Sequence, residues 1–137
     1  MIVVDTNVIA YLWLPGPHSD NAERALRKDS VWAAPVLWRS EFRNVIVGYM
    51  RRRQISYAVA TDILSEAEAL MRGREYSVPS DHILRWTMQS NCSAYDCEFV
   101  ALAQDLETSL VTTDKQLIAA FPKIAVTLDK FVRNVSR

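Results

Sequence analysis

Two aspartates each come just after a short apolar run, a position that is typical of chemistry at the edge of a sheet. Asp5 directly follows Ile2, Val3 and Val4, and Asp114 follows the run at 109–112. Short runs rich in β-branched residues are typical of strands buried on both faces of a parallel sheet. Functional groups of such sheets gather beyond the carboxyl ends of the strands. We therefore expect both carboxylates at one edge of a sheet.

Two further acids lie beside the apolar faces of predicted helices. Glu41 stands between Leu37 and Val45 at four-residue spacing, and Asp96 is in line with Phe99 in the first turn of its helix. A carboxylate near a core is costly unless it is paired, hydrogen-bonded or bound to a metal. Clustered oxygen ligands without His or Cys suit Mg²⁺ or Mn²⁺. The predicted site contains Asp5, Glu41, Asp96 and Asp114.

Each acid also has a purely structural interpretation. Asp5 and Asp114 could cap the helices that follow them. Asp96, three residues after Ser93, could complete a capping box, and Glu41 could pair with a neighbouring arginine. Any one of these interpretations is sufficient for a single acid. Four such placements in one chain favour a shared site.

The elements that must position these acids alternate along the chain. Strands are predicted at 2–4, 31–34, 75–78, 109–112 and 124–127. Helices are predicted at 6–14, 21–28, 36–51, 57–71, 81–90, 94–107 and 114–120, with a final turn or short helix at 128–132. This alternation predicts a helix-rich α/β fold, with a short parallel sheet flanked by helices on both faces. At 137 residues we expect one domain over 1–137.

Basic residues could bind nucleic acid only as local patches, because 16 basic and 16 acidic side chains give no net charge. A basic helix end also suits the helix dipole without any ligand. The candidates for contact with nucleic acid are Arg39, Arg43, Arg51, Arg52 and Arg53, with Arg24 and Lys28.

The remaining composition narrows the class of protein. Cys92 and Cys97 match no metal or redox spacing, so we expect reduced, buried thiols. No apolar run approaches the ~18 residues of a membrane span, and no secretory leader is evident, so we expect a cytoplasmic protein without membrane contact.

Three other classes of protein are excluded by missing residues. A haloacid-dehalogenase-type phosphatase needs a second acid where Asn7 stands, and a response-regulator receiver needs paired acids early in the chain. The three glycines form no nucleotide-binding loop.

Four short motifs, in order, resemble the PIN domain. They are Asp5-Thr6-Asn7, Ser40-Glu41-Phe42, Ser93-Ala94-Tyr95-Asp96 and Val111-Thr112-Thr113-Asp114. The chain looks most like the ribonuclease toxins of bacterial VapBC toxin–antitoxin modules. Each motif alone is weak, but the ordered set is specific and the resemblance covers essentially the whole chain.

The resemblance implies a PIN-like fold and an endoribonuclease that depends on Mg²⁺, with Mn²⁺ as a possible substitute. It implies that Asp5, Asp96 and Asp114 are the main metal ligands, and that Glu41 holds a second metal or orients water. Thr6, Asn7 and Thr113 would support the acids. The implied partners are RNA, a cognate antitoxin docked in a groove between the early helices and the Glu41 helix, and a second copy in a homodimer. The alternative is a PIN-like module that binds RNA or protein without cutting.

Overall fold

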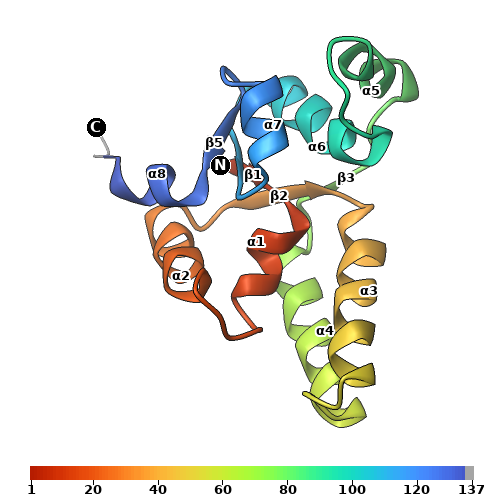
Figure 1. Ribbon diagram of the computed structural model, residues 1–137, viewed down its shortest axis with the longest axis vertical. Helices are drawn as coiled ribbons and strands as arrows, with labels where there is room; N and C mark the ends of the chain where they lie inside the picture. The colour runs from red at the N-terminus through yellow and green to blue at the C-terminus, as the bar shows by residue number, and fades with distance from the viewer. Residues whose placement is uncertain (135–137) are drawn as a thin grey trace.

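Five short parallel strands form the centre of this computed structural model, which describes residues 1–134 (Figure 1). The strands are β1 (Ile2–Val4), β2 (Trp32–Pro35), β3 (Glu75–Tyr76), β4 (Leu110–Thr112) and β5 (Ala125–Thr127). Their order across the sheet is β3-β2-β1-β4-β5. Val3 of the central strand pairs with Ala33 on one side and with Leu110 on the other. All five predicted strands are therefore present, in a parallel sheet as expected.

The direction of the chain across the sheet reverses beside β1. From β1 the chain moves outward to β2 and β3, and then returns to β4 and β5 on the other side. In open parallel sheets such a switch point, at the carboxyl ends of the strands, is where ligands bind. Asp5 follows β1 and Asp114 comes after β4, so the topology brings the two acids to the switch point.

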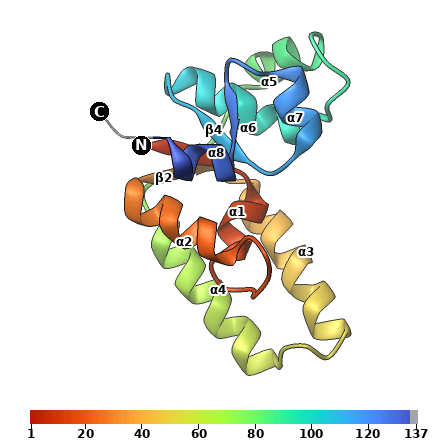
Figure 2. The same ribbon diagram turned by 60° about the vertical axis from the view of Figure 1, so that its left-hand side comes forward.

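Helices cover both faces of the sheet, as predicted (Figure 1). One face carries α5 (Ser80–Thr87), α6 (Ala94–Asp105) and α7 (Lys115–Ala120). The other carries α1 (Thr6–Tyr11), α2 (Ser19–Lys28), α3 (Trp38–Arg51) and α4 (Tyr57–Met71), with α8 (Leu128–Arg133) packed against α2. Figure 2 shows that α3 and α4 form a long hairpin that extends away from the sheet.

The core lies on both sides of the central strands. Val3, Val4 and Val111 are completely buried, and α6 contributes the buried Val100 and Ala103 from one face. This explains why the strands are continuously apolar rather than alternating. Both cysteines are buried and free, as the sequence predicted. Within residues 1–134, none of the helices combines the length and the apolar character that crossing a membrane would require.

Most element boundaries differ from the sequence prediction by a few residues, and two of these differences lie beside prolines. Pro35 ends β2, whereas the predicted strand stopped at residue 34. The N–H groups of Ala34 and Val36 make the bonds to the β3 segment, so the proline removes no donor from that ladder. The first helix ends at Tyr11 rather than at Leu14, and turns lead into the loop at 15–17, because a residue before proline disfavours helical geometry.

Candidate active site

Asp5 is held by two hydrogen bonds at the end of the central strand. It is the N-cap of α1, where Oδ1 accepts a hydrogen bond of 3.0 Å from the N–H of Val8. Its Oδ2 accepts from the hydroxyl of Thr112. The side chain is only 8% exposed. The capping interpretation is therefore correct for Asp5, and capping fixes the carboxylate at the switch point of the sheet.

Asp114 repeats this arrangement after β4. It is the N-cap of α7, and its Oδ1 accepts from the N–H groups of Gln116 at 2.8 Å and Leu117 at 3.3 Å. Its Oδ2 has no hydrogen-bond partner among residues 1–134. Capping and ligand binding are thus compatible, because the cap occupies one carboxylate oxygen and leaves the second for the pocket.

Thr112 connects the two aspartates, and sequence reasoning missed it. This fully buried threonine donates to Asp5 and accepts a hydrogen bond of 3.0 Å from the N–H of Asp114. We expected Thr113 in this role, but the Thr113 hydroxyl is hydrogen-bonded to the hydroxyl of Tyr11 at 2.8 Å. The available signal was that Thr112 ends the strand and precedes Asp114 by two residues.

Glu41 enters from the first turn of α3. The hydroxyl of Thr6 donates to Glu41 Oε1 at 2.7 Å, so Thr6 contacts one of the acids, as we expected. Glu41 makes no ion pair with an arginine among the described residues. The arginine-pair interpretation is therefore wrong for Glu41.

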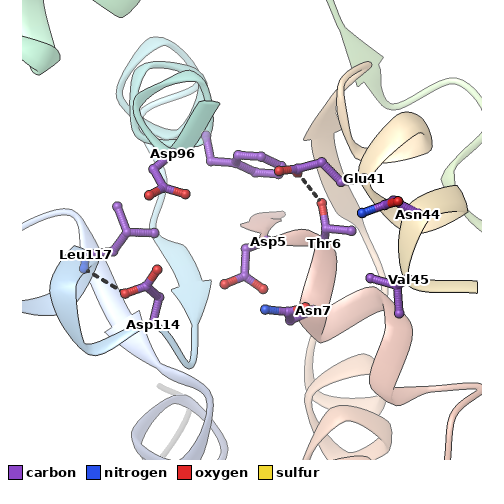
Figure 3. Close-up of a pocket in the computed structure, with 10 residues that line it drawn as sticks. Asp5, Thr6, Asn7, Glu41, Asn44, Val45, Asp96, Asp114 and Leu117 are labelled. Carbon is purple, nitrogen blue, oxygen red and sulfur yellow. Dashed lines mark hydrogen bonds between the residues drawn. The ribbon is translucent and has the colours of Figure 1, made fainter. Parts of the chain in front are cut away.

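Asp96 enters from the N-terminus of α6. Ser93 caps this helix by accepting a hydrogen bond of 3.1 Å from the N–H of Asp96. The return bond of a capping box, from the Asp96 carboxylate to the N–H of Ser93, is not formed within residues 1–134. The carboxylate instead points toward the space occupied by the carboxylates of Asp5 and Asp114 (Figure 3).

All four acids line one cavity of about 270 Å³. Its other lining residues are Thr6, Asn7, Asn44, Val45, Phe99 and Leu117, and none of the lining residues is basic. Sequence reasoning missed Asn44 as a lining residue. Its spacing was informative, since it lies three positions after Glu41 and therefore on the same side of the helix.

Burial and mutual repulsion disfavour the charged form of these acids. Burial raises the pKa of Asp5 from 3.8 to about 6, with smaller contributions from the charges of Asp114 and Glu41, although bonds from Thr112 and Val8 oppose the rise. Burial likewise raises the pKa of Glu41 and of Asp96, and a neighbouring aspartate adds to each effect. The pocket is therefore a site where negative charge accumulates without a protein cation.

The donor set of the pocket fits a hard divalent cation. Four carboxylates and two nearby amides offer oxygen ligands only, as Mg²⁺ prefers. In residues 1–134, however, no three acidic, His or Cys side chains are already arranged to hold a metal ion. The chemistry of the residues fits a metal, while their side chains are not preassembled around one.

The basic residues predicted to contact RNA are dispersed. Arg39 is engaged by Glu75 and Glu68, Arg24 pairs with Asp20, and Lys28 donates to backbone carbonyls near the C-terminus. Arg52 lies over the ring of Tyr49. Arg43 is exposed on α3, two residues after Glu41, whereas Arg51 and Arg53 lie at or just beyond the distal end of this helix.

Comparisons with known proteins agree with this fold. A family model described as PIN domain matches residues 2–124. Ribonuclease VapC3 of Pyrobaculum aerophilum is 27% identical over 126 residues, which cover 90% of this chain and 96% of the relative. Ribonuclease VapC1 of Mycobacterium tuberculosis is 34% identical over 106 residues, which cover 71% and 73%.

A solved structure supports the fold independently. PAE2754 from Pyrobaculum aerophilum superposes with a TM-score of 0.75 at 20% identity, over 96% of this chain and 92% of the other. This likeness confirms the expected helix-rich α/β architecture. The match of the family model and the identity to Ribonuclease VapC1 show the family as well as the fold. The chain therefore belongs to the PIN domain family and, within it, to the VapC ribonucleases.

Proposed function

We propose that this VapC-family ribonuclease hydrolyses phosphodiester bonds of RNA in the acid pocket, with Mg²⁺ held by Asp5, Asp96, Asp114 and Glu41. One observation carries the proposal. Four carboxylates from four separate segments line a single cavity that has no basic side chain, and burial raises the pKa of three of them. Such a cluster is unfavourable in the folded protein unless an external cation joins it.

The chain's own residues would fix and orient the site. Thr112 and the N-terminus of α1 hold both oxygens of Asp5, while Thr6 holds one oxygen of Glu41. When bound, Mg²⁺ would lower the pKa of a coordinated water and offset charge on the phosphate. Asn7 and Asn44 line the α1 and α3 side of the pocket, where their amides can donate to phosphate oxygens.

Metal-dependent cleavage tests this proposal directly. Purified protein should cut RNA in Mg²⁺ or Mn²⁺ and lose that activity in EDTA. Asp96→Asn should reduce cleavage strongly, because it removes a proposed ligand. Asp20→Asn, which removes an exposed carboxylate of α2, should leave cleavage unchanged. Activity that persists in EDTA, or in the Asp96 variant, would refute the proposed site.

The alternative is a PIN-like module that binds RNA or protein without cutting. A functional site should be stabilised by metal, because a ligand that binds only the native state raises its stability. Thermal denaturation in increasing Mn²⁺ should therefore raise the Tm of the wild type but not of Asp5→Ala. An unchanged Tm together with RNA binding would favour the alternative.

We also propose a cognate antitoxin that docks between the segment that follows α1 and the α3–α4 hairpin. A cavity of about 510 Å³ lies there, with apolar lining from Trp13, Tyr49, Ile55, Val59 and Ile63. An apolar groove of this kind suits the apolar face of a partner helix. Co-expression with the adjacent open reading frame, followed by capture, should yield a complex that Val59→Asp weakens. A homodimer is also proposed, and light scattering of the purified chain tests it.

Arg43, Arg51 and Arg52 remain proposed RNA contacts on α3. No ion pair among residues 1–134 uses these three side chains. Binding should weaken as salt increases, and each lost phosphate contact should reduce the slope of log K against log salt by about 1. Arg43→Gln should show this change, and an unchanged slope would remove Arg43 from the RNA surface.

A further inference from the structure

A second cavity adjoins the acid pocket and has a different character. It is lined by the α1 residues Ala10 and Tyr11, by the loop 14–18, and by Tyr49 of α3. Asn7 and Val45 line both cavities, so the two are contiguous. The lining is mainly apolar and aromatic, whereas the acid pocket is dominated by carboxylates. A ligand that reaches the acids can therefore extend into this second space.

The aromatic side chains of this cavity are arranged to stack a flat ring. The rings of Tyr11 and His18 lie against each other with centroids 4.8 Å apart. Tyr11 is half-buried and His18 is exposed, so the outer ring of the pair is open to a ligand. Tyr49 of α3 adds a third ring to the lining of the cavity. The cavity thus offers ring surfaces from three separate parts of the chain.

The size of the cavity limits what it can hold. Its volume of about 190 Å³ is below the ~300–1,000 Å³ that is usual for drug-sized ligands. One planar ring system fits such a space, while a base pair in a helix does not. Asn7 and the ring nitrogens of His18 can hydrogen-bond to the edge of a ring placed there.

We propose that this cavity, with Tyr11, His18 and Tyr49, is a nucleobase subsite for the nucleotide next to the scissile phosphate. The inference rests on the proposed ribonuclease function and deepens it. A base can enter only if it leaves the stack of its own strand, so the substrate at the cleaved bond is unpaired RNA. Stacking on aromatic rings is the usual way in which proteins hold unpaired bases.

The structure also connects the subsite to the acids. The Tyr11 hydroxyl is hydrogen-bonded to Thr113, the residue immediately before Asp114. Asn7 lines both cavities two residues after Asp5. A base held against His18 and Tyr11 would therefore place its own phosphate beside the carboxylates. His18 acts in this proposal as a residue that determines specificity and positions substrate, without taking part in the chemistry.

Abasic substitution in the substrate tests the subsite. Single-stranded oligonucleotides with one abasic position each, moved stepwise past the cleaved bond, should reveal one position where losing the base raises KM about tenfold, the size of one lost stack. His18→Ala should raise KM for the intact oligonucleotide by a similar factor and should erase the effect of the abasic position. His18→Phe keeps a flat ring and should restore most of the affinity.

The only other histidine provides a matched control. His82 lies on α5, is bonded to Asp105 and lines neither cavity, so His82→Ala should cleave like the wild type. Equal cleavage of all abasic substrates, or an abasic effect that persists in His18→Ala, would overturn the subsite and leave the ribonuclease standing. If His18→Ala weakens antitoxin binding without any change in RNA kinetics, the cavity holds a side chain of the antitoxin. That result would also overturn the nucleobase subsite. A chain that cuts no RNA at all would refute both proposals.

Discussion

Two carboxylate clusters of this protein differ in whether other side chains stabilise their negative charge. At the base of the α3–α4 hairpin, Glu75 accepts hydrogen bonds from the Trp38 indole at 2.8 Å and from Arg39 at 2.6 and 2.8 Å. Arg39 also donates to Glu68 at 3.0 Å. These bonds, above all those from Arg39, lower the pKa of Glu75. In the acid pocket burial dominates instead, and the pKa of Asp5, Glu41 and Asp96 is raised.

The contrast distinguishes the acid pocket from a carboxylate that stabilises the fold. Where a carboxylate serves the fold, as at Glu75, the chain supplies an arginine and an indole to stabilise its charge. In the acid pocket it supplies only hydroxyls and backbone N–H groups, which position the carboxylates without neutralising them. A carboxylate cluster that the chain does not neutralise fits the metal site proposed above, although its side chains are not preassembled around an ion.

The two clusters are also mechanically connected through α3. Trp38 and Arg39 belong to the first turn of this helix, which also carries Glu41. The bonds to Glu75 fix that turn against β3, and the bond to Glu68 fixes it against α4. The bonds that Glu75 and Glu68 make to this turn therefore help to hold Glu41 in position at one side of the acid pocket.

Removing one charge from the acid pocket should have the largest effect on activity. Asp5→Asn keeps the cap of α1, because its side-chain oxygen can still accept from Val8, but it loses the anionic ligand. We expect RNA cleavage to fall by about a thousandfold or more, since a bound metal contributes several kcal/mol to such a reaction. Single-turnover cleavage at saturating Mg²⁺ measures this. A loss below tenfold would place Asp5 outside the proposed ligand set.

The same substitution should stabilise the metal-free protein. The pKa of Asp5 is about 6 in the folded state and 3.8 in an unperturbed carboxyl, so the folded state binds more protons between these values and loses stability as pH rises through them. At about 1.4 kcal/mol per pH unit, Asp5→Asn should gain on the order of 3 kcal/mol above pH 6 and little below pH 4.

Urea denaturation in EDTA, at a series of pH values, measures this gain. The difference between variant and wild type is informative because the other titrating groups are common to both. Mg²⁺ should reduce the difference, since it stabilises only the wild type. A difference that does not change with pH would show that Asp5 is not strained by its charge.

Thr112→Val should show how much the orientation of the Asp5 and Asp114 carboxylates matters when their charges are kept. Valine preserves the shape of this buried side chain but removes the hydroxyl that bridges Asp5 and Asp114. Groups that orient metal ligands typically contribute 10–100-fold to affinity or activity. We expect a loss of this size in cleavage, together with weaker Mn²⁺ binding. Thr108→Val is the control, because its hydroxyl bonds to Met1 at the amino ends of β4 and β1, opposite to the strand ends that carry the acids, and Thr108 does not line the pocket.

The four acids were predictable from sequence because local patterns determined their positions. Strand ends located Asp5 and Asp114, and helical periodicity placed Glu41 and Asp96 on the inner side of their helices. The parallel sheet then brought the strand ends together. Strand and helix positions followed from apolar runs in the same way, although the ends of most elements differ by a few residues.

The side-chain partners were not predictable, because they depend on which segments meet in space. Arg39 looked like an RNA contact, but β3 and α4 bring Glu75 and Glu68 to it from 36 and 29 residues away. Thr112 and Thr113 are adjacent and chemically identical. Strand geometry turns one toward Asp5 and the other toward Tyr11, a difference that the sequence indicates only through the strand end at Thr112.

Glu75→Gln should reverse the sign of the pH effect seen at Asp5, with a smaller magnitude. Because Arg39 lowers the pKa of Glu75, this carboxylate stabilises the fold above its usual pKa of 4.5 and ceases to do so as pH falls. The variant should therefore lose about 1–2 kcal/mol at neutral pH, the size of a charge-assisted bond. That difference should shrink in acid, whereas the Asp5→Asn gain should grow with rising pH.

Cleavage should fall only a few-fold in Glu75→Gln, because Glu41 keeps its bond to Thr6 while the first turn of α3 loosens. Glu68→Gln is the matched control. It removes one bond from a more exposed carboxylate and should cost less stability at every pH. If Glu75→Gln and Glu68→Gln behave alike, the Arg39 cluster is an ordinary surface ion pair. If Glu75→Gln instead stabilises the protein as pH rises, the two carboxylate clusters do not differ in the way that their pKa shifts indicate.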